Sequence, residues 1–268
     1  MSISTSDEVM HPVLTPEQQE SVNRDLFEVI WANNIPKVIA LIKQGADVNA
    51  VDRYGNTALM EAARFARPEI ARILIEQGAD VNGARTVYGK TALMQAAYNG
   101  HNAITALLLE RGADVNAADR CGNTALIEAA HYGYAKTTRL LIDAGAEVNA
   151  TARNGQSALM WAAYYGYTQT TRLLIEGGAD AQMAATNLFL RCSTDDIAKL
   201  RKLKTGDIEN PDLISSGKAR GIATIIALAQ NLNFDSIKQD FRVQNRENSQ
   251  LLLAPVDKCA NLRAAVRP

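Results

Sequence analysis

One stretch of the chain has the residue types of a phosphate-binding loop. Residues 83–91 read Gly-Ala-Arg-Thr-Val-Tyr-Gly-Lys-Thr, so a glycine stands directly before Lys90 and Thr91. Such a loop requires four residues between its two glycines, whereas five residues separate Gly83 from Gly89. No apolar strand precedes the stretch, and Gly89 and Thr91 also belong to a longer repeated pattern. We therefore predict no nucleotide site here.

The histidines and cysteines do not combine into a catalytic or metal-binding set. The chain has three histidines, His11, His101 and His131. No two of them have the spacing that places metal ligands on one face of a helix. The cysteines are odd in number and widely spaced, at Cys121, Cys192 and Cys259. This spacing predicts neither a disulfide framework nor a metal site, and it fits a reducing compartment best. We therefore expect no catalytic residues, no metal and no cofactor.

Composition and charge narrow the class of protein further. Hydrophobic residues make up 47% of the 268 residues and charged residues 21%, which is typical of a globular chain. The net charge of −1 gives no overall attraction to nucleic acid or membrane. No apolar run is long enough to span a bilayer, and the first residues lack a signal-peptide pattern. These observations predict a cytoplasmic protein with neither a nucleic-acid nor a membrane partner.

Two short phrases recur at a fixed period through the middle of the chain. Gly-Asn-Thr-Ala-Leu-Met at 55–60 returns, with small changes, at 89–94, 122–127 and 155–160. The second phrase, Gly-Ala-Asp or Gly-Ala-Glu, recurs 33 or 34 residues apart, beginning at Gly45, Gly78, Gly112, Gly145 and Gly178. A constant period of this length indicates stacked repeats whose neighbours bury one another's apolar faces.

These phrases resemble the ankyrin-repeat family over about residues 19–182. The resemblance implies an all-α solenoid in which each repeat contributes two antiparallel helices and a protruding β-hairpin finger. One departure recurs, because the family's usual Thr-Pro-Leu-His is replaced by Thr-Ala-Leu-Met, Thr-Ala-Leu-Ile or Ser-Ala-Leu-Met. Losing the proline and the histidine removes a preset backbone angle and a hydrogen-bonding side chain, which bears on stability rather than on the fold.

The second repeat shows how local sequence encodes the helix pair. Thr57 stands where its hydroxyl can cap the first helix, and the small side chains of Ala62 and Ala63 allow close helix packing. Pro68 falls at the start of the second helix, where its missing N–H costs little. Gly78 supplies the left-handed turn that ends that helix.

The chain divides into three parts on this basis. Residues 1–18 are predicted to be a flexible lead-in, and residues 19–184 to be five repeats, of which the first is a cap without its finger sequence. Residues 185–268 are predicted to form a degenerate helical cap, to about residue 232, followed by a C-terminal extension.

The aromatic side chains indicate where a partner binds. All eight tyrosines fall between Tyr54 and Tyr167, and the resemblance implies that finger tips and first-helix ends line a concave face. Tyrosine, tryptophan and arginine are the side chains that most often anchor protein interfaces. For Trp161 and Tyr167, packing between repeats or against the cap is the alternative role. The predicted partner-binding residues are Arg53, Tyr54, Arg64, Phe65, Tyr88, Tyr98, Asn99, Arg120, His131, Tyr132, Arg153, Trp161, Tyr164 and Tyr165.

The resemblance also implies candidate hydroxylation sites. Asparagines at matching finger positions are hydroxylated in similar ankyrin proteins of animal cells. The corresponding positions here are Asn49, Asn82, Asn116 and Asn149. The alternative is that each asparagine bonds the backbone of its turn.

The predicted function is protein–protein interaction, as a monomeric adaptor, inhibitor or scaffold without enzymatic activity. Two alternatives stay open. The chain can be a bacterial effector secreted into a host cytosol, where it acts on a host protein. Alternatively, the repeats recruit a substrate for a small modifying domain in the C-terminal part.

Overall fold

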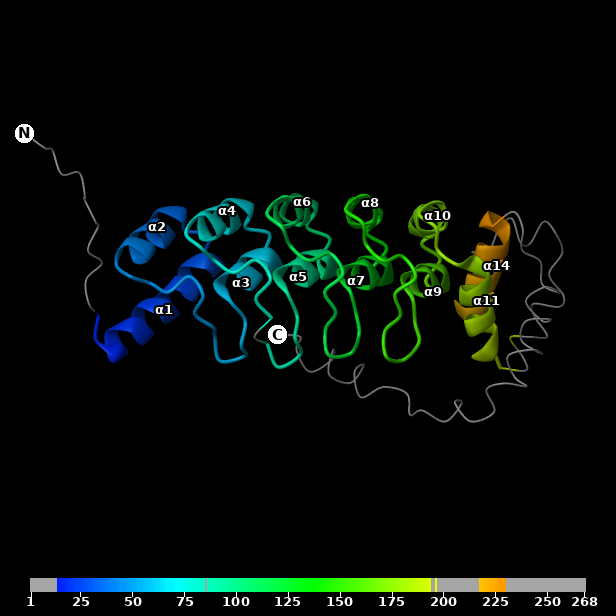
Figure 1. Cartoon of the computed structure of the whole chain (residues 1–268), viewed down its shortest axis with the longest axis horizontal. Coiled ribbons are helices and arrows are strands. Elements are labelled where there is room, and N and C mark those ends of the chain that lie inside the picture. The colour runs from blue at the N-terminus through cyan, green and yellow to red at the C-terminus, as the bar shows by residue number, and fades with distance from the viewer. Residues whose placement is uncertain (1–13, 85, 194–195, 197–216, 230–268) are drawn as a thin grey trace, which may run out of the picture.

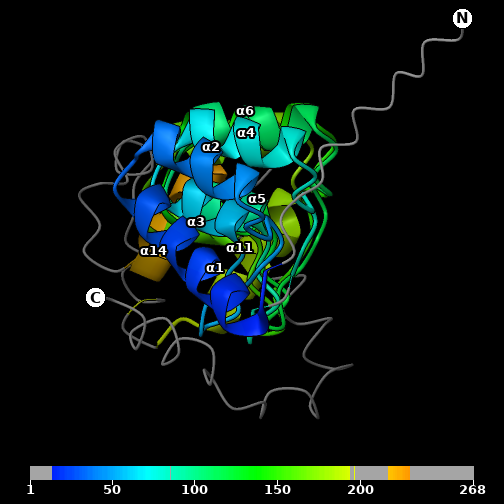
Figure 2. The same cartoon turned by 90° about the vertical axis from the view of Figure 1, so that its left-hand side faces the viewer.

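The computed structural model describes residues 14–84, 86–193, 196 and 217–229. Within these ranges the chain is an elongated stack of helix pairs in two layers (Figure 1). The first helix of each repeat lies in one layer: α1 (Pro16–Trp31), α3 (Ala58–Arg64), α5 (Ala92–Tyr98), α7 (Ala125–His131) and α9 (Ala158–Tyr164). The second helices form the other: α2 (Ile35–Lys43), α4 (Pro68–Glu76), α6 (Asn102–Glu110), α8 (Ala135–Asp143) and α10 (Thr168–Glu176). The predicted all-α solenoid is confirmed, and Figure 2 shows its two layers end-on.

The helix boundaries follow from the residues that the sequence places there. The Thr57 hydroxyl accepts the backbone N–H of Met60 at 3.2 Å and so caps α3. Pro68 is the first residue of α4, and Gly78 follows that helix with a φ of +86°. The left-handed turn after each first helix is also made by glycine in the later repeats, whereas the second repeat uses Ala66 at a φ of +55°.

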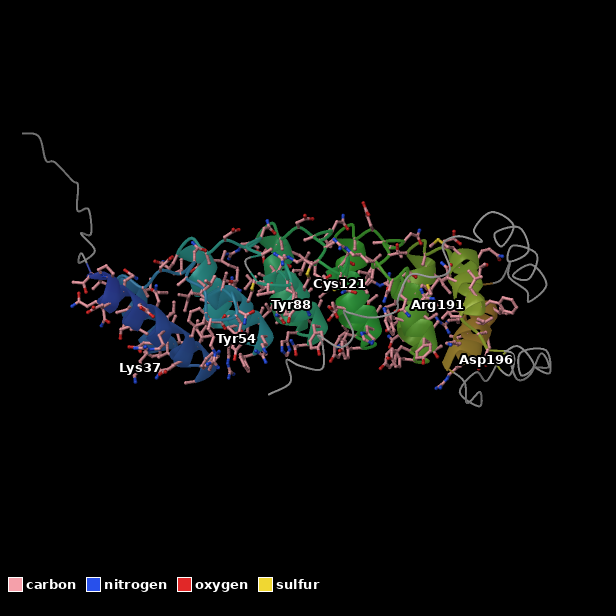
Figure 3. All side chains as sticks on the ribbon, turned by 90° about the horizontal axis from the view of Figure 1, so that it is seen from below. Lys37, Tyr54, Tyr88, Cys121, Arg191 and Asp196 are labelled. Atoms are coloured by element: carbon pink, nitrogen blue, oxygen red, sulfur yellow. The ribbon has the colours of Figure 1, made fainter. Side chains whose placement is uncertain are left out.

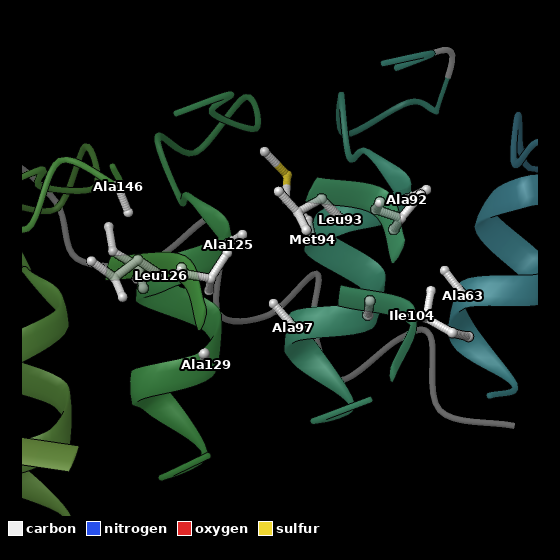
Figure 4. Close-up of a cluster of buried hydrophobic side chains, with 14 of the residues drawn as sticks. Ala63, Ala92, Leu93, Met94, Ala97, Ile104, Ala125, Leu126, Ala129 and Ala146 are labelled. Atoms are coloured by element: carbon white, nitrogen blue, oxygen red, sulfur yellow. The ribbon is translucent and has the colours of Figure 1, made fainter. Parts of the chain in front are cut away.

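The buried hydrophobic side chains form one cluster along the stack, and Figure 4 shows the part of it around α5 and α7. The paired alanines of the first helices are fully buried, as their small size requires for close approach. Apolar side chains fill the place where the family usually has histidine, and each is at most 1% exposed: Met60, Met94, Ile127 and Met160. Burial of these side chains in the core takes the place of the hydrogen bonds that the histidine would supply.

The fingers are turns closed by a side chain rather than regular β-hairpins. In the described residues the pairing between finger arms is limited to isolated bridges: Val51 with Thr57, Ala118 with Thr124, and Thr151 with Ser157. A carboxylate oxygen of Asp52 accepts the backbone N–H groups of Tyr54 and Asn56, each at 2.8 Å. Asp119 makes the same pattern two fingers further on. The β-hairpin finger expected from the resemblance is therefore reduced to a hydrogen-bonded turn.

Two helices cover the C-terminal end of the stack. α11 (Ala181–Leu190) follows the fifth repeat, and α14 (Gly217–Leu228) packs against both α9 and α11. Gly217 allows this approach, because a Cβ there would lie 2.8 Å from the Tyr164 ring. α1 begins inside the predicted lead-in, and α11 crosses the predicted boundary at residue 184. Residues 194–195, 197–216 and 230–232 of the predicted cap, and the predicted extension after it, lie outside the described residues.

Candidate partner-binding face

The ends of the first helices place equivalent side chains in rows along the stack. The residue 14 positions before each loop glycine is the first member of a row, which reads Trp31, Arg64, Tyr98, His131 and Tyr164. The next position of each repeat gives the second row, Ala32, Phe65, Asn99, Tyr132 and Tyr165. Because stacked repeats share one geometry, equivalent residues of successive repeats lie next to each other along the stack.

Five rings of these rows and of α9 are in continuous contact from the third to the fifth repeat. We call Tyr98, His131, Tyr132, Trp161 and Tyr165 the aromatic ladder. The Tyr98 and Tyr132 ring centroids lie 4.8 Å apart, and those of His131 and Trp161 lie 4.1 Å apart. Trp161 and Tyr165 stack with an interplanar angle of 9°. His131 Nε2 is 3.4 Å from the Tyr165 hydroxyl.

The ladder is held by the packed repeats and remains partly exposed. Tyr165 is 42% exposed, and the other four side chains are half-buried. Half-buried rings fixed by their neighbours lose little side-chain entropy when a partner covers them. This arrangement suits an interface anchor.

The remaining tyrosines of this region fill spaces between elements. A Cβ on Gly100 would lie 2.7 Å from the Tyr134 ring, and one on Gly133 would lie 2.6 Å from the Tyr167 ring. Each ring therefore lies against the glycine turn of the preceding repeat. Tyr167 has the packing role considered for it as an alternative. Tyr164 joins the ladder edge-on at Trp161 and also packs against Gly217 of α14.

Trp31 belongs to this surface and was missed by the sequence reasoning, which treated the first repeat only as a cap. Its side chain is 45% exposed, and its Nε1–H donates to Glu61 at 2.8 Å. A signal was available in the sequence, because Trp31 stands 14 residues before Gly45, as Arg64 does before Gly78. Arg64 in turn lies 5.2 Å above the Phe65 ring.

Two carboxylates are buried beneath this surface and are not exposed on it. Glu61 is 2% exposed and Glu128 is 1% exposed. Burial raises the pKa of Glu61, and the Trp31 hydrogen bond and nearby Arg64 act in the opposite direction. Lys90 reaches from the third finger to within 3.5 Å of Glu128 and lies 5.0 Å from the Tyr98 ring centroid. Lys90 therefore shows that fingers and first-helix ends border one surface.

The finger tips form the second part of this surface, which we call the finger row: Arg53, Tyr54, Tyr88, Arg120 and Arg153. Tyr54 is 60% exposed, with the Arg53 guanidinium 4.7 Å from its ring centroid. The Arg120 N–H donates to the Tyr88 carbonyl at 2.8 Å, which joins two successive fingers. Figure 3 shows Tyr54, Tyr88 and Cys121 following one another along the stack. Asn99 lies apart from the finger row, where its amide bonds the Gln95 carbonyl at 2.8 Å.

The four candidate hydroxylation sites form a ladder of a different kind. The Asn49 amide donates to the Gly78 carbonyl at 3.0 Å and accepts the Asp80 N–H at 2.7 Å. The same pair of bonds recurs from Asn82, Asn116 and Asn149, each reaching the next repeat. In the first repeat, Gln19 and Asn23 of α1 make the corresponding bonds to Gly45 and Asp47. We call this set the asparagine ladder; it bonds turn backbone, but across repeats rather than within one.

The cysteines require one correction. Cys121 is disulfide-bonded, so the expectation of unpaired cysteines is wrong for that residue and the cysteines give no support for a reducing compartment. Cys192 is a free thiol, and burial raises its pKa to about 12. In the part of the chain that the structure describes, no three His, Cys, Asp or Glu side chains gather as a metal site would require. No helix there is long and apolar enough to cross a membrane.

Comparison with known proteins agrees with the fold. The family model for ankyrin repeats (3 copies) matches residues 26–119 and 114–185, which together are more than half of the chain. The chain therefore belongs to the ankyrin-repeat family, whose repeats generally mediate protein–protein interaction.

Similarity to curated proteins is confined to short stretches. The mitochondrial disaggregase of Bos taurus is 46% identical over 57 residues, which are 21% of this chain and 8% of that protein. The human mitochondrial disaggregase is 45% identical over 62 residues, 22% of this chain and 9% of the relative. A putative ankyrin repeat protein of fowlpox virus is 44% identical over 48 residues, which are 18% of this chain and 9% of that protein. This chain therefore spans less than a tenth of the length of each relative.

Proposed function

We propose that the chain binds a protein partner along its aromatic ladder and finger row and works as an adaptor, inhibitor or scaffold. The observation that carries the proposal is the unbroken contact of Tyr98, Tyr132, His131, Trp161 and Tyr165. Aromatic side chains bury a large area at modest entropic cost and dominate interface energetics. A row of them that stays partly exposed after folding supports binding, because the exposed part of each ring is left for a partner to cover.

The proposed protein acts as a monomer that recognises a protein rather than nucleic acid, and its cytoplasmic location, which the cysteines do not support, stays a prediction. Its role is non-enzymatic, in keeping with the class of function that ankyrin repeats generally serve. Hydroxylation of the four ladder asparagines stays a prediction, tested by mass spectrometry of the protein from its native cell for the added oxygen.

The test compares two triple variants of the full chain. In the first, Tyr98, Tyr132 and Tyr165 are changed together to Ala. In the control, the exposed Arg72, Lys136 and Arg172 of the second helices are changed to Ala. The second layer lies on the other side of the core, so the control changes a comparable amount of surface away from the proposed face.

Partners are captured with the unaltered chain, and the dissociation constant of each purified partner is then measured against all three proteins. The tyrosine variant should keep its helical circular dichroism and weaken binding by several kcal/mol, on the order of three hot-spot truncations. The control should bind as the unaltered chain does. Equal affinity for the unaltered chain and a folded tyrosine variant would overturn the proposed face.

A further inference from the structure

The finger row carries positive charge that the described part of the chain does not neutralise. Arg53, Arg120 and Arg153 occupy the same position, two residues before the finger glycine, and all three are exposed. The ion pairs within the described ranges are made by other cations, namely Arg64, Lys90, Arg111 and Arg139. Three guanidinium groups at equivalent places along the stack are therefore available to a partner.

Four acidic side chains near this surface, Asp52, Glu61, Asp119 and Glu128, are engaged in hydrogen bonds or buried. The carboxylates of Asp52 and Asp119 accept the hydrogen bonds that close their own finger turns. Glu61 and Glu128 are buried beneath Trp31, Arg64 and Lys90. A partner that meets the finger row therefore encounters exposed cations and engaged anions, and complementary charge favours an acidic segment.

The spacing of the repeats selects a conformation for that segment. Packed helices lie about 8–10 Å apart, so equivalent arginines of adjacent fingers are separated by a similar distance. A polyproline II helix advances about 9 Å in each turn of three residues, which keeps every third side chain on one face. A carboxylate at every third residue would therefore meet Arg53, pass one repeat, and then meet Arg120 and Arg153 in turn.

The aromatic ladder suits the other face of the same segment. Aromatic-lined grooves bind polyproline II segments because these are preformed and lose little entropy on binding. Lys90, next to the finger glycine Gly89, contacts both Tyr98 and Glu128, so the fingers and the aromatic ladder adjoin on one surface. Resting on the function proposed above, we propose that the partner segment is an acidic peptide in polyproline II conformation. It has a carboxylate at about every third residue and proline or other apolar residues between.

The probe is a labelled peptide of four Glu-Pro-Pro units, with binding to the full chain measured by fluorescence anisotropy. Three comparison peptides have Gln or Lys in place of every Glu, or the same composition with all Glu residues in one block. Three proteins are compared with the unaltered chain. These are the variant R53Q/R120Q/R153Q, the charge-matched control R72Q/K136Q/R172Q, and the Tyr-to-Ala variant described above.

The Glu peptide should bind the unaltered chain more tightly than the Gln, Lys and block peptides, and added salt should weaken it. Each exposed ion pair contributes little by itself, so loss of all three in R53Q/R120Q/R153Q should weaken binding by about tenfold. R72Q/K136Q/R172Q should bind as the unaltered chain does.

Each contrary result identifies which proposal has failed. If the Gln and Glu peptides bind equally and both depend on the tyrosines, the acidic specificity is wrong while the aromatic face stands. Equal binding of the block peptide refutes the three-residue spacing. If no peptide binds, the inference about the segment is wrong, and the proposed face is still judged by its own experiment with captured partners. Peptide binding that is indifferent to both the arginine and tyrosine variants overturns both proposals.

Discussion

Replacing Asn82 by Ala tests whether the asparagine ladder couples one repeat to the next. The Asn82 amide donates to the Gly112 carbonyl at 3.1 Å and accepts the Asp114 N–H at 2.8 Å. Each bond contributes about 0.5–1.5 kcal/mol, and the site is exposed, so water takes over part of the loss. The expected cost is about 1–2 kcal/mol, which is a fall in melting temperature of roughly 2–8 °C for a chain of this size.

Urea unfolding measured by circular dichroism provides the assay. In a solenoid, stability is a sum of repeat terms and nearest-neighbour terms. Weakening the link from the second to the third repeat should therefore lower the midpoint and broaden the transition. The variant N82D should cost more than N82A, because a carboxylate cannot donate to the Gly112 carbonyl and faces it with like partial charge.

Asn154 supplies the matched control. It also makes two exposed side-chain bonds, of 3.0 and 3.1 Å, but both go to Gln156 within its own finger. N154A should therefore leave the cooperativity of unfolding unchanged. The coupling argument is refuted if N82A and N154A have the same effect, or if N82D is no worse than N82A.

Four further predictions concern single residues. G133A should destabilise the chain by more than about 1–2 kcal/mol, the strain of a left-handed alanine, because its Cβ would also lie 2.6 Å from a tyrosine ring; a thermal melt measures this. A66G should raise the melting temperature, because Ala66 already holds that strained conformation at a φ of +55°. Burial raises the pKa of Glu61 above its ordinary 4.5. The stabilisation from protonated Glu61 is therefore full below pH 4.5 and is lost as the pH rises through the folded-state pKa. Glutamine does not titrate, so the urea midpoint of E61Q should rise relative to that of the unaltered chain between pH 4.5 and 7. Burial raises the pKa of Cys192 to about 12, so its thiol should react with an alkylating reagent far more slowly in the native protein than in urea, as mass spectrometry would show.

The repeat pattern was enough to predict the helix pairs, because their determinants are local. A hydroxyl at Thr57, a proline at Pro68 and a glycine at Gly78 each act within one turn of the backbone they terminate. The inter-repeat bonds of the asparagine ladder were not predictable in the same way. They join Asn49 to a carbonyl 29 residues away, a distance that only the stack defines. The resemblance directed attention to the asparagines for their chemistry, whereas the structure gives them a mechanical role.

For the candidate face, too, the sequence identified the residue types but not their positions in space. Tyrosine positions marked the surface, but the sequence did not separate the exposed Tyr165 from Tyr167, whose ring occupies the space beside Gly133. That distinction depends on a glycine in the preceding repeat. Trp31 was overlooked because the first repeat lacks its finger sequence, although its helix keeps the register of the others. A repeat that has lost its finger sequence can therefore still contribute first-helix side chains to the shared surface.

The two ends of the proposed binding face differ in chemistry, so we expect a bound segment to prefer one direction. At the N-terminal end, Trp31 and Arg64 cover a buried carboxylate, Glu61, so the surface there is partly polar. At the C-terminal end, the equivalent position to Glu61 is Trp161, which stacks on His131 and extends the ladder. A segment with an apolar residue at one end should bind most tightly when that end contacts Trp161. In the reverse orientation the apolar residue would lie over the buried carboxylate of Glu61. Specificity of this kind is a difference between two orientations of one ligand, and it follows from repeats that share a backbone but not their side chains.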